Sequence, residues 1–142
     1  MNYTQLEEDL ISDYGIWLRA RQTNNGHFVI GVGNKTDVST KEISLERAGF
    51  LLSNRIAKSL SNVSTIFSIQ FFDSLHESIQ RVLLAIEYED GLKDMPEFVE
   101  SVRNKDWESA LTNFLQTDFA KIHPRRASRI SGILSQGDTL WQ

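Results

Sequence analysis

The sequence predicts an α+β fold made of an N-terminal helix, a small β-hairpin and then an all-helical region. Apolar residues recur at helical spacing between Tyr3 and Ile11. Two β-prone runs, 16–21 and 27–33, flank an Asn-Asn-Gly sequence that suits a hairpin turn. After position 42 the apolar residues recur at helical spacing only, so we expect no further strands there.

The N-terminal elements have recognisable ends. The first helix is expected to stop at Gly15. Residues 34–42 are polar and turn-like, and Ser44 can cap a helix over 45–60 that breaks at 61–64. We therefore expect a single domain, with an N-terminal helix and hairpin lobe at 1–42 and a helical lobe at 43–142.

The helical lobe is expected to form around one central helix. An apolar stripe from Phe72 to Ile86 predicts this helix, which should end near Gly91. Pro96 and Pro124 suit the first turns of two more helices. The residues expected to be buried together are Leu75, Ile79, Val82, Leu83, Ile86, Trp107, Leu111, Phe114, Ile130 and Leu134.

Composition excludes several classes of function. The 142 residues carry a formal net charge of −4, so we expect no nucleic-acid partner and no attraction to anionic membranes. There is no Cys, the three His residues are scattered, and the acidic run 87–90 is expected to be a solvated helix end, so we expect no metal and no cofactor. We find no secretory signal and no apolar run of the ~20 residues that span a membrane.

Two blocks of sequence carry a resemblance to a known family. The first block is Tyr14-Gly15-Ile16-Trp17-Leu18-Arg19 running to Gly26-His27-Phe28-Val29-Ile30-Gly31-Val32-Gly33-Asn34. The second runs from Phe72-Asp73-Ser74-Leu75 through Gly91, Phe98 and Trp107 to Pro124-Arg125-Arg126-Ala127 and Gly137. In these blocks the chain resembles the T-even-type phage lysozymes, the muramidases of glycoside hydrolase family 24. The resemblance implies a lysozyme-like fold, with a reduced hairpin lobe or inter-lobe helix because the stretch between the blocks is shorter.

The resemblance also implies that the catalytic groups have been replaced. The general acid of the family, a Glu immediately before a Gly, is Tyr14 here, and its second carboxylate, an Asp in the hairpin, is Thr23. The Thr that helps to position the attacking water is Val29. Glycoside hydrolysis needs a pair of carboxyl groups, and loss of a general acid alone costs about 10²–10⁴ in rate. We therefore expect no catalytic residue in this chain.

Other residues are candidates for lining a cleft or binding a partner. They are Asp13, His27, Phe28, Asn34, Glu89, Arg126 and Trp141. The resemblance places Asn34 at the His that closes the family's strand and Glu89 at a cleft-lining Gln. It places Arg126 at an Arg that contacts the acid, so Arg126 is expected to pair with Asp13, to hydrogen-bond Tyr14 or to bind an anionic partner. Bulky residues at polar cleft positions would either fill the cleft or form a docking surface.

The function expected from these observations is a non-catalytic lysozyme-fold protein. We expect a structural component of a phage tail or baseplate that contacts other virion proteins, in the virion or in the host cytoplasm before assembly. The alternatives are a peptidoglycan-binding module, a divergent active muramidase (an endolysin) with a relocated acid, and a regulator such as a decoy for a lysozyme inhibitor. The residues alone leave these alternatives open.

Overall fold

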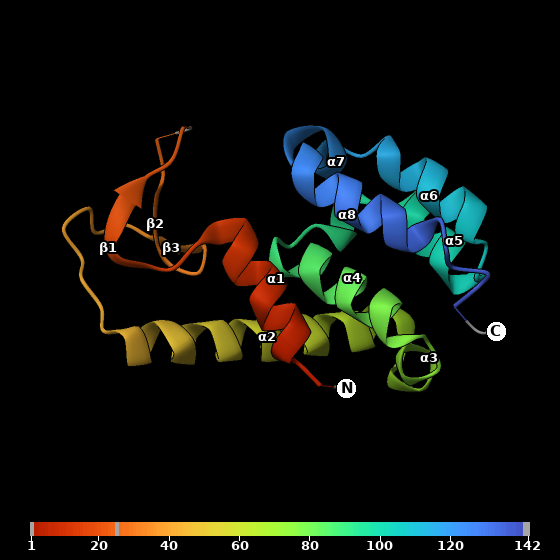
Figure 1. The fold of residues 1–142 in the computed structure, drawn as a ribbon, viewed down its shortest axis with the longest axis horizontal. Helices are drawn as coiled ribbons and strands as arrows, with labels where there is room; N and C mark the ends of the chain where they lie inside the picture. The colour runs from red at the N-terminus through yellow and green to blue at the C-terminus, as the bar shows by residue number, and fades with distance from the viewer. Residues whose placement is uncertain (1, 25, 141–142) are drawn as a thin grey trace. The chain divides into compact units, whose positions relative to one another are not determined.

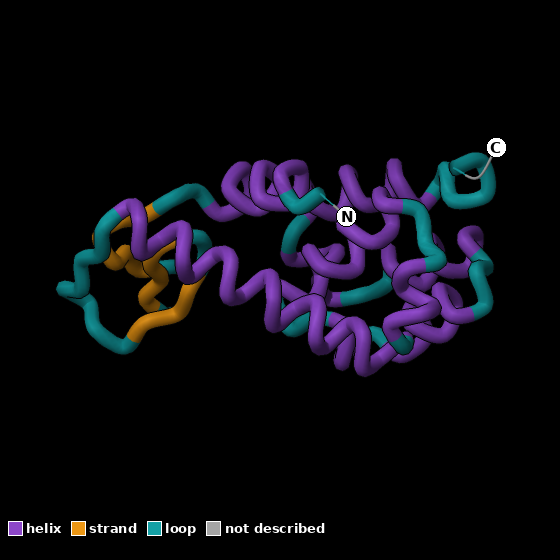
Figure 2. The backbone as a smooth tube through the Cα atoms, turned by 90° about the horizontal axis from the view of Figure 1, so that it is seen from below, coloured by secondary structure: helices purple, strands orange, loops and turns teal. Residues whose placement is uncertain are grey.

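A computed structural model describes residues 2–24 and 26–140 and shows an α+β fold. An N-terminal helix is followed by a three-stranded antiparallel sheet and then by an all-helical C-terminal part (Figure 1). The chain forms two compact units, which we call unit 1 (Met1–Lys58) and unit 2 (Ser59–Gln142). The described strands all belong to unit 1, and Figure 2 draws them in orange.

Helix α1 (Thr4–Tyr14) matches the predicted first helix. Leu6 and Leu10 are buried, and their spacing of four puts them on one helix face. Gly15 has a φ of +73° and donates its N–H to the Ile11 carbonyl at 2.7 Å. The predicted stop at Gly15 is therefore confirmed, because glycine enters this left-handed region at little cost.

The predicted hairpin is confirmed, but the sheet has one more strand than expected. β1 (Trp17–Gln22), β2 (Phe28–Gly31) and β3 (Asn34–Thr36) pair in that order, all antiparallel. The stretch 34–42 was expected to be turn-like, and this was wrong for its first three residues, which form β3. A tight reversal between β2 and β3 lets this polar segment pair with β2 through its backbone, which leaves no apolar alternation to read in the sequence.

Helix α2 (Leu45–Phe67) begins as predicted and continues further than predicted. The Ser44 hydroxyl accepts the Arg47 N–H at 3.0 Å, which confirms the cap. The break expected at 61–64 was wrong. Val63 is fully buried and continues the apolar stripe of the helix, so burial outweighs the weak helix propensity of the neighbouring Ser and Asn residues. One helix therefore belongs to both units.

In unit 2 the expected central helix is divided in two. It consists of α3 (Ile69–Asp73) and α4 (Glu77–Tyr88), and Nδ1 of His76 accepts the Ser78 N–H at 3.1 Å to begin the second helix. The helices that follow are η1 (Leu92–Asp94), α5 (Pro96–Arg103), α6 (Trp107–Leu115), α7 (Asp118–Ile122) and α8 (Pro124–Leu134). Pro96 and Pro124 stand in first turns as predicted, whereas η1 and α7 are too short to give a periodic signal.

The predicted core of unit 2 is largely confirmed. Nine of its ten residues are buried, including Leu83 with 0% of its surface exposed, and Leu111 is half-buried. The Phe98 and Phe114 rings lie 5.8 Å apart within this core. Among the described residues, no helix combines the length and the apolar character needed to cross a membrane.

Candidate functional site

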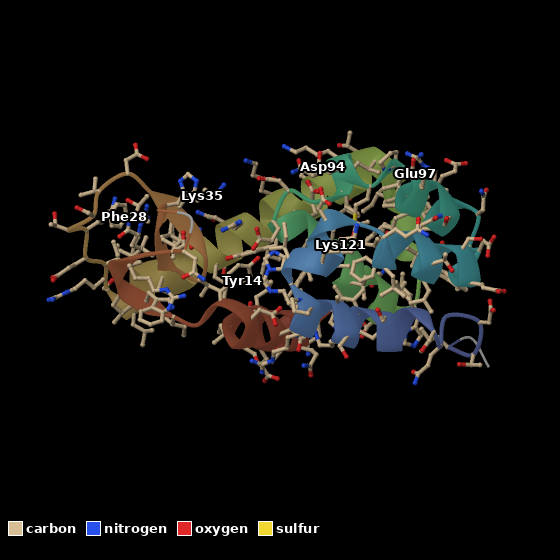
Figure 3. The ribbon with its side chains drawn as sticks, turned by 90° about the horizontal axis from the view of Figure 1, so that it is seen from above. Tyr14, Phe28, Lys35, Asp94, Glu97 and Lys121 are labelled. Carbon is tan, nitrogen blue, oxygen red and sulfur yellow. The ribbon has the colours of Figure 1, made fainter. Side chains whose placement is uncertain are left out.

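Tyr14 is the last residue of α1, and its ring lies against the turn between β2 and β3 (Figure 3). A Cβ atom placed on Gly33 would overlap the Tyr14 ring, so glycine is the residue that fits there. The main-chain carbonyl of Tyr14 accepts the Trp17 indole N–H at 3.1 Å. This candidate position is therefore occupied by aromatic packing within unit 1.

Thr23 closes the hairpin turn. Its hydroxyl donates to the His27 carbonyl at 3.1 Å, and its backbone N–H donates to the same oxygen at 2.7 Å. The His27 side chain is exposed at the hairpin. The Thr23 hydroxyl thus has a structural role in the turn, which the sequence alone did not reveal.

Phe28 and Val29 lie in the middle strand of the sheet, and both are half-buried. Val29 pairs with Arg21 on one side and with Lys35 on the other. An isopropyl group offers no hydrogen bond to a water molecule, so Val29 packs and does not position a nucleophile. Phe28 pairs with Thr36 in the same register.

Asn34 opens β3, and its Oδ1 atom is buried without a hydrogen-bond donor among the described residues. The carbonyl oxygen of the preceding residue, Gly33, accepts a hydrogen bond from Nη1 of Arg55 at 2.6 Å. A buried acceptor without a donor costs about 1–3 kcal/mol, so Asn34 is a place where unit 1 carries an unfavourable polar contact.

Glu89 and Arg126 form an ion pair within unit 2. Nη1 of Arg126 lies 3.1 Å from Oε1 of Glu89, and the two side chains are 14% and 28% exposed. The pair connects the end of α4 to the first turn of α8. Asp13 is half-buried on α1 in unit 1, and Trp141 lies outside the described residues.

The acidic run 87–90 is not the solvated helix end that we expected. Glu87 is 7% exposed. Its carboxylate accepts two hydrogen bonds, one from Nδ2 of Asn62 at 3.0 Å and one from the Leu92 N–H at 3.3 Å. These bonds connect α4 to α2 and η1. The signal in the sequence is the spacing of four residues from Leu83, which puts Glu87 on the buried face.

A groove in unit 2 was not predicted from the sequence. It consists of two adjoining hollows with volumes of about 360 and 370 Å³. Asp94, Met95, Thr117 and Asp118 line both hollows, so the hollows form one surface, which we call the α5–α7 groove. Glu89, Phe119 and His123 line one end, and Glu97 and Asn113 line the other. Figure 3 shows Asp94 and Glu97 at this surface.

The described side chains indicate what the groove can do. Its lining combines the carboxylates of Asp94 and Asp118 with the apolar side chains of Met95 and Phe119, which suits a ligand with both cationic and apolar groups. No group of three or more potential metal ligands occurs among residues 2–24 and 26–140.

The pKa of Asp106, which caps α6, lies below its usual value because of hydrogen bonds from the Ser109 hydroxyl and backbone N–H.

No protein-family model matches the chain, and a search of the curated proteins finds no match. The resemblance to the family 24 muramidases therefore rests on the two sequence blocks and on the order of the elements.

Proposed function

We propose that this protein is a non-catalytic member of the lysozyme-like group that acts by binding other proteins, as a structural component of a phage tail or baseplate. The observation that carries the proposal is the Tyr14 ring packed on Gly33. The resemblance requires a proton-donating carboxyl group at this position, and a packed aromatic side chain cannot replace it.

The two other candidate catalytic positions support the same conclusion. The Thr23 hydroxyl is used by the hairpin turn, and Val29 has no polar atom in its side chain. Hydrolysis of a glycoside requires an acid and a second carboxyl group on opposite sides of the bond. Unit 1 offers neither group at these positions, so the hydrolytic reaction loses its electrostatic and proton-transfer assistance together.

The competing enzyme hypothesis would have to use carboxylates elsewhere. Glu89, Asp94 and Asp118 share one end of the α5–α7 groove, but the Glu89 carboxylate is engaged by Arg126. A relocated acid at Glu89 would therefore have to give up its ion pair with Arg126 before it could reach a substrate.

The deciding experiment is hydrolysis of purified peptidoglycan, followed by turbidity and by release of reducing sugars. An active phage lysozyme serves as the positive control. We expect no turnover from the wild-type protein or from a Tyr14→Phe variant. Turnover that persists in Tyr14→Phe and disappears in Glu89→Gln would refute the proposal and establish a divergent muramidase.

A parallel co-sedimentation with insoluble peptidoglycan separates protein binding from glycan binding. We expect the protein to stay in the supernatant. Saturable pelleting without hydrolysis would replace the structural role with that of a peptidoglycan-binding module.

A further inference from the structure

Strand β1 has hydrogen bonds along both edges, yet its side chains are mostly uncovered. β2 pairs along one edge, and the 41–43 segment pairs along the other, where Ala20 donates to the Lys41 carbonyl at 2.9 Å. Five of the six residues of β1 are nevertheless exposed. A partner therefore cannot add a strand at this place and has to recognise side chains.

These side chains combine apolar and cationic groups. Ile16, Trp17 and Leu18 are 41%, 38% and 41% exposed. The Arg21 guanidinium lies 4.2 Å from the centre of the Trp17 ring, and Arg19 forms an exposed ion pair with Glu42. We call Trp17, Arg19 and Arg21 the β1 surface, because alternate residues of a strand share one face of the sheet.

The β1 surface is organised before any partner arrives. The Trp17 indole N–H is fixed on the Tyr14 carbonyl, and the ring is stacked with Arg21. Trp and Arg are enriched among the residues that dominate binding energy, and side chains that are already ordered lose less entropy on binding. The surface is therefore suited to a specific contact.

The α5–α7 groove offers the opposite charge. Asp94, Glu97 and Asp118 are exposed, and none of them forms an ion pair with another described residue. Unit 1 balances seven Asp and Glu with seven Lys and Arg, so the formal net charge of −4 belongs to unit 2. Met95 and Phe119 in the lining of the groove complement the Trp17 ring of the β1 surface.

We propose that the β1 surface of one copy of this chain docks into the α5–α7 groove of a second copy. Each hollow exceeds the ~300 Å³ at the lower end of ligand pockets, so each has room for a large side chain. The two surfaces differ, so the contact is heterologous, and repeated copies form an open chain or a ring. This inference rests on the proposed structural function and names the partner as the chain itself.

Sedimentation velocity on the whole protein at rising concentration tests the contact first. In about 0.05 M salt the sedimentation coefficient should rise with concentration, and in about 1 M salt it should fall to the monomer value, because the Debye length shrinks to about 3 Å. A protein that stays monomeric at every concentration in low salt overturns the proposal. Salt-resistant association overturns it as well.

Charge reversal then identifies the two surfaces. We expect Arg19→Glu with Arg21→Glu, and separately Asp94→Lys with Glu97→Lys, to lower the association constant at least about tenfold. Matched controls reverse exposed charges elsewhere: Lys35→Glu on β3 of the same sheet, and Glu100→Lys on the same helix as Glu97. These controls should associate like the wild type, and circular dichroism verifies that each variant is folded.

A mixing experiment gives the decisive geometry. Neither double variant should self-associate, but a mixture of the two offers two complementary pairings, the natural β1 surface with the natural groove and the reversed β1 surface with the reversed groove, so the two variants should associate in alternating copies. A chain with all four reversals should associate again, because both charges have changed sign. If the mixture stays monomeric and the fourfold variant does not recover, the pairing of these surfaces is wrong.

The outcome is independent of the hydrolysis assay. A monomeric, inactive protein would refute self-docking and leave the non-catalytic proposal intact. A self-associating protein that digests peptidoglycan would support self-docking and refute the non-catalytic proposal.

Discussion

Units 1 and 2 are stabilised by different means. Among the described residues, seven buried hydrophobic residues lie in unit 1 and twenty-two in unit 2, so hydrophobic burial dominates the second unit far more than the first. Unit 1 depends instead on backbone pairing and on glycines with positive φ, such as Gly31 and Gly33. We infer that unit 2 is sensitive to lost volume, whereas unit 1 is sensitive to the conformation of its turns.

The largest effect is expected from Leu83→Ala in unit 2. Leu83 is fully buried in α4, and removing three carbon atoms from such a site costs about 2–5 kcal/mol of unfolding free energy. Urea unfolding measures this cost. Leu115→Ala, at a position that is 50% exposed, should change it by less than about 0.5 kcal/mol. Equal costs for the two variants would contradict the buried register of α4.

Gly33→Ala should give the next largest effect and tests the turn in unit 1. The φ of +71° and the overlap with the Tyr14 ring together predict a loss of about 2–4 kcal/mol. Adding Tyr14→Ala should recover the part that comes from the ring. Gly49→Ala is the control, because its Cβ would meet nothing within 4 Å in α2, and it should stabilise by about 0.5–1 kcal/mol. A tolerated Gly33→Ala would show that Tyr14 does not fill this space.

The ion pairs of the two units provide a third test. Arg126→Met leaves Glu89 half-buried without its guanidinium, and we expect a loss of about 1–3 kcal/mol. Glu42→Gln breaks the exposed pair with Arg19 in unit 1 and should cost less than about 1 kcal/mol. The double variant Glu89→Met with Arg126→Met should be milder than Arg126→Met alone. Chemical unfolding of the wild type and the three variants at one salt concentration measures these differences in unfolding free energy.

The smallest effect concerns Asp106, the cap of α6. Its pKa is lower in the folded state than the usual 3.8, so its contribution to stability is complete above about pH 3.8 and is lost as the pH falls through the folded value. Thermal melts of the wild type and of Asp106→Asn should therefore differ at pH 6 and converge in acid. Ser109→Ala should act in the same direction and more weakly, because the backbone N–H donor remains. A difference that grows in acid would reverse the sign of the linkage.

Strong periodic signals in the sequence predicted most of the fold. Gly15, Pro96 and Pro124 marked helix ends correctly because they act through local backbone geometry. β3 and the end of α2 were mispredicted because tertiary pairing and the burial of Val63 outweigh local preference.

The candidate site was less predictable than the fold. The resemblance predicted Tyr14 and Thr23 as replaced catalytic positions, and the structure adds the contacts that these two residues make. The α5–α7 groove brings together residues from Glu89 to His123, and no spacing in the sequence relates them. Tertiary packing determines such a surface, which is why the sequence did not predict it.

The 23 residues of α2 have a consequence for how the protein could be cut into fragments. A break between Lys58 and Ser59 would fall inside a continuous ladder of i→i−4 hydrogen bonds. It would expose about four carbonyl groups on one fragment and about four N–H groups on the other. Because helix propagation is cooperative, unravelling that starts in one unit can travel along α2 into the next. The two units share one backbone ladder, and neither can be excised at that boundary with intact ends.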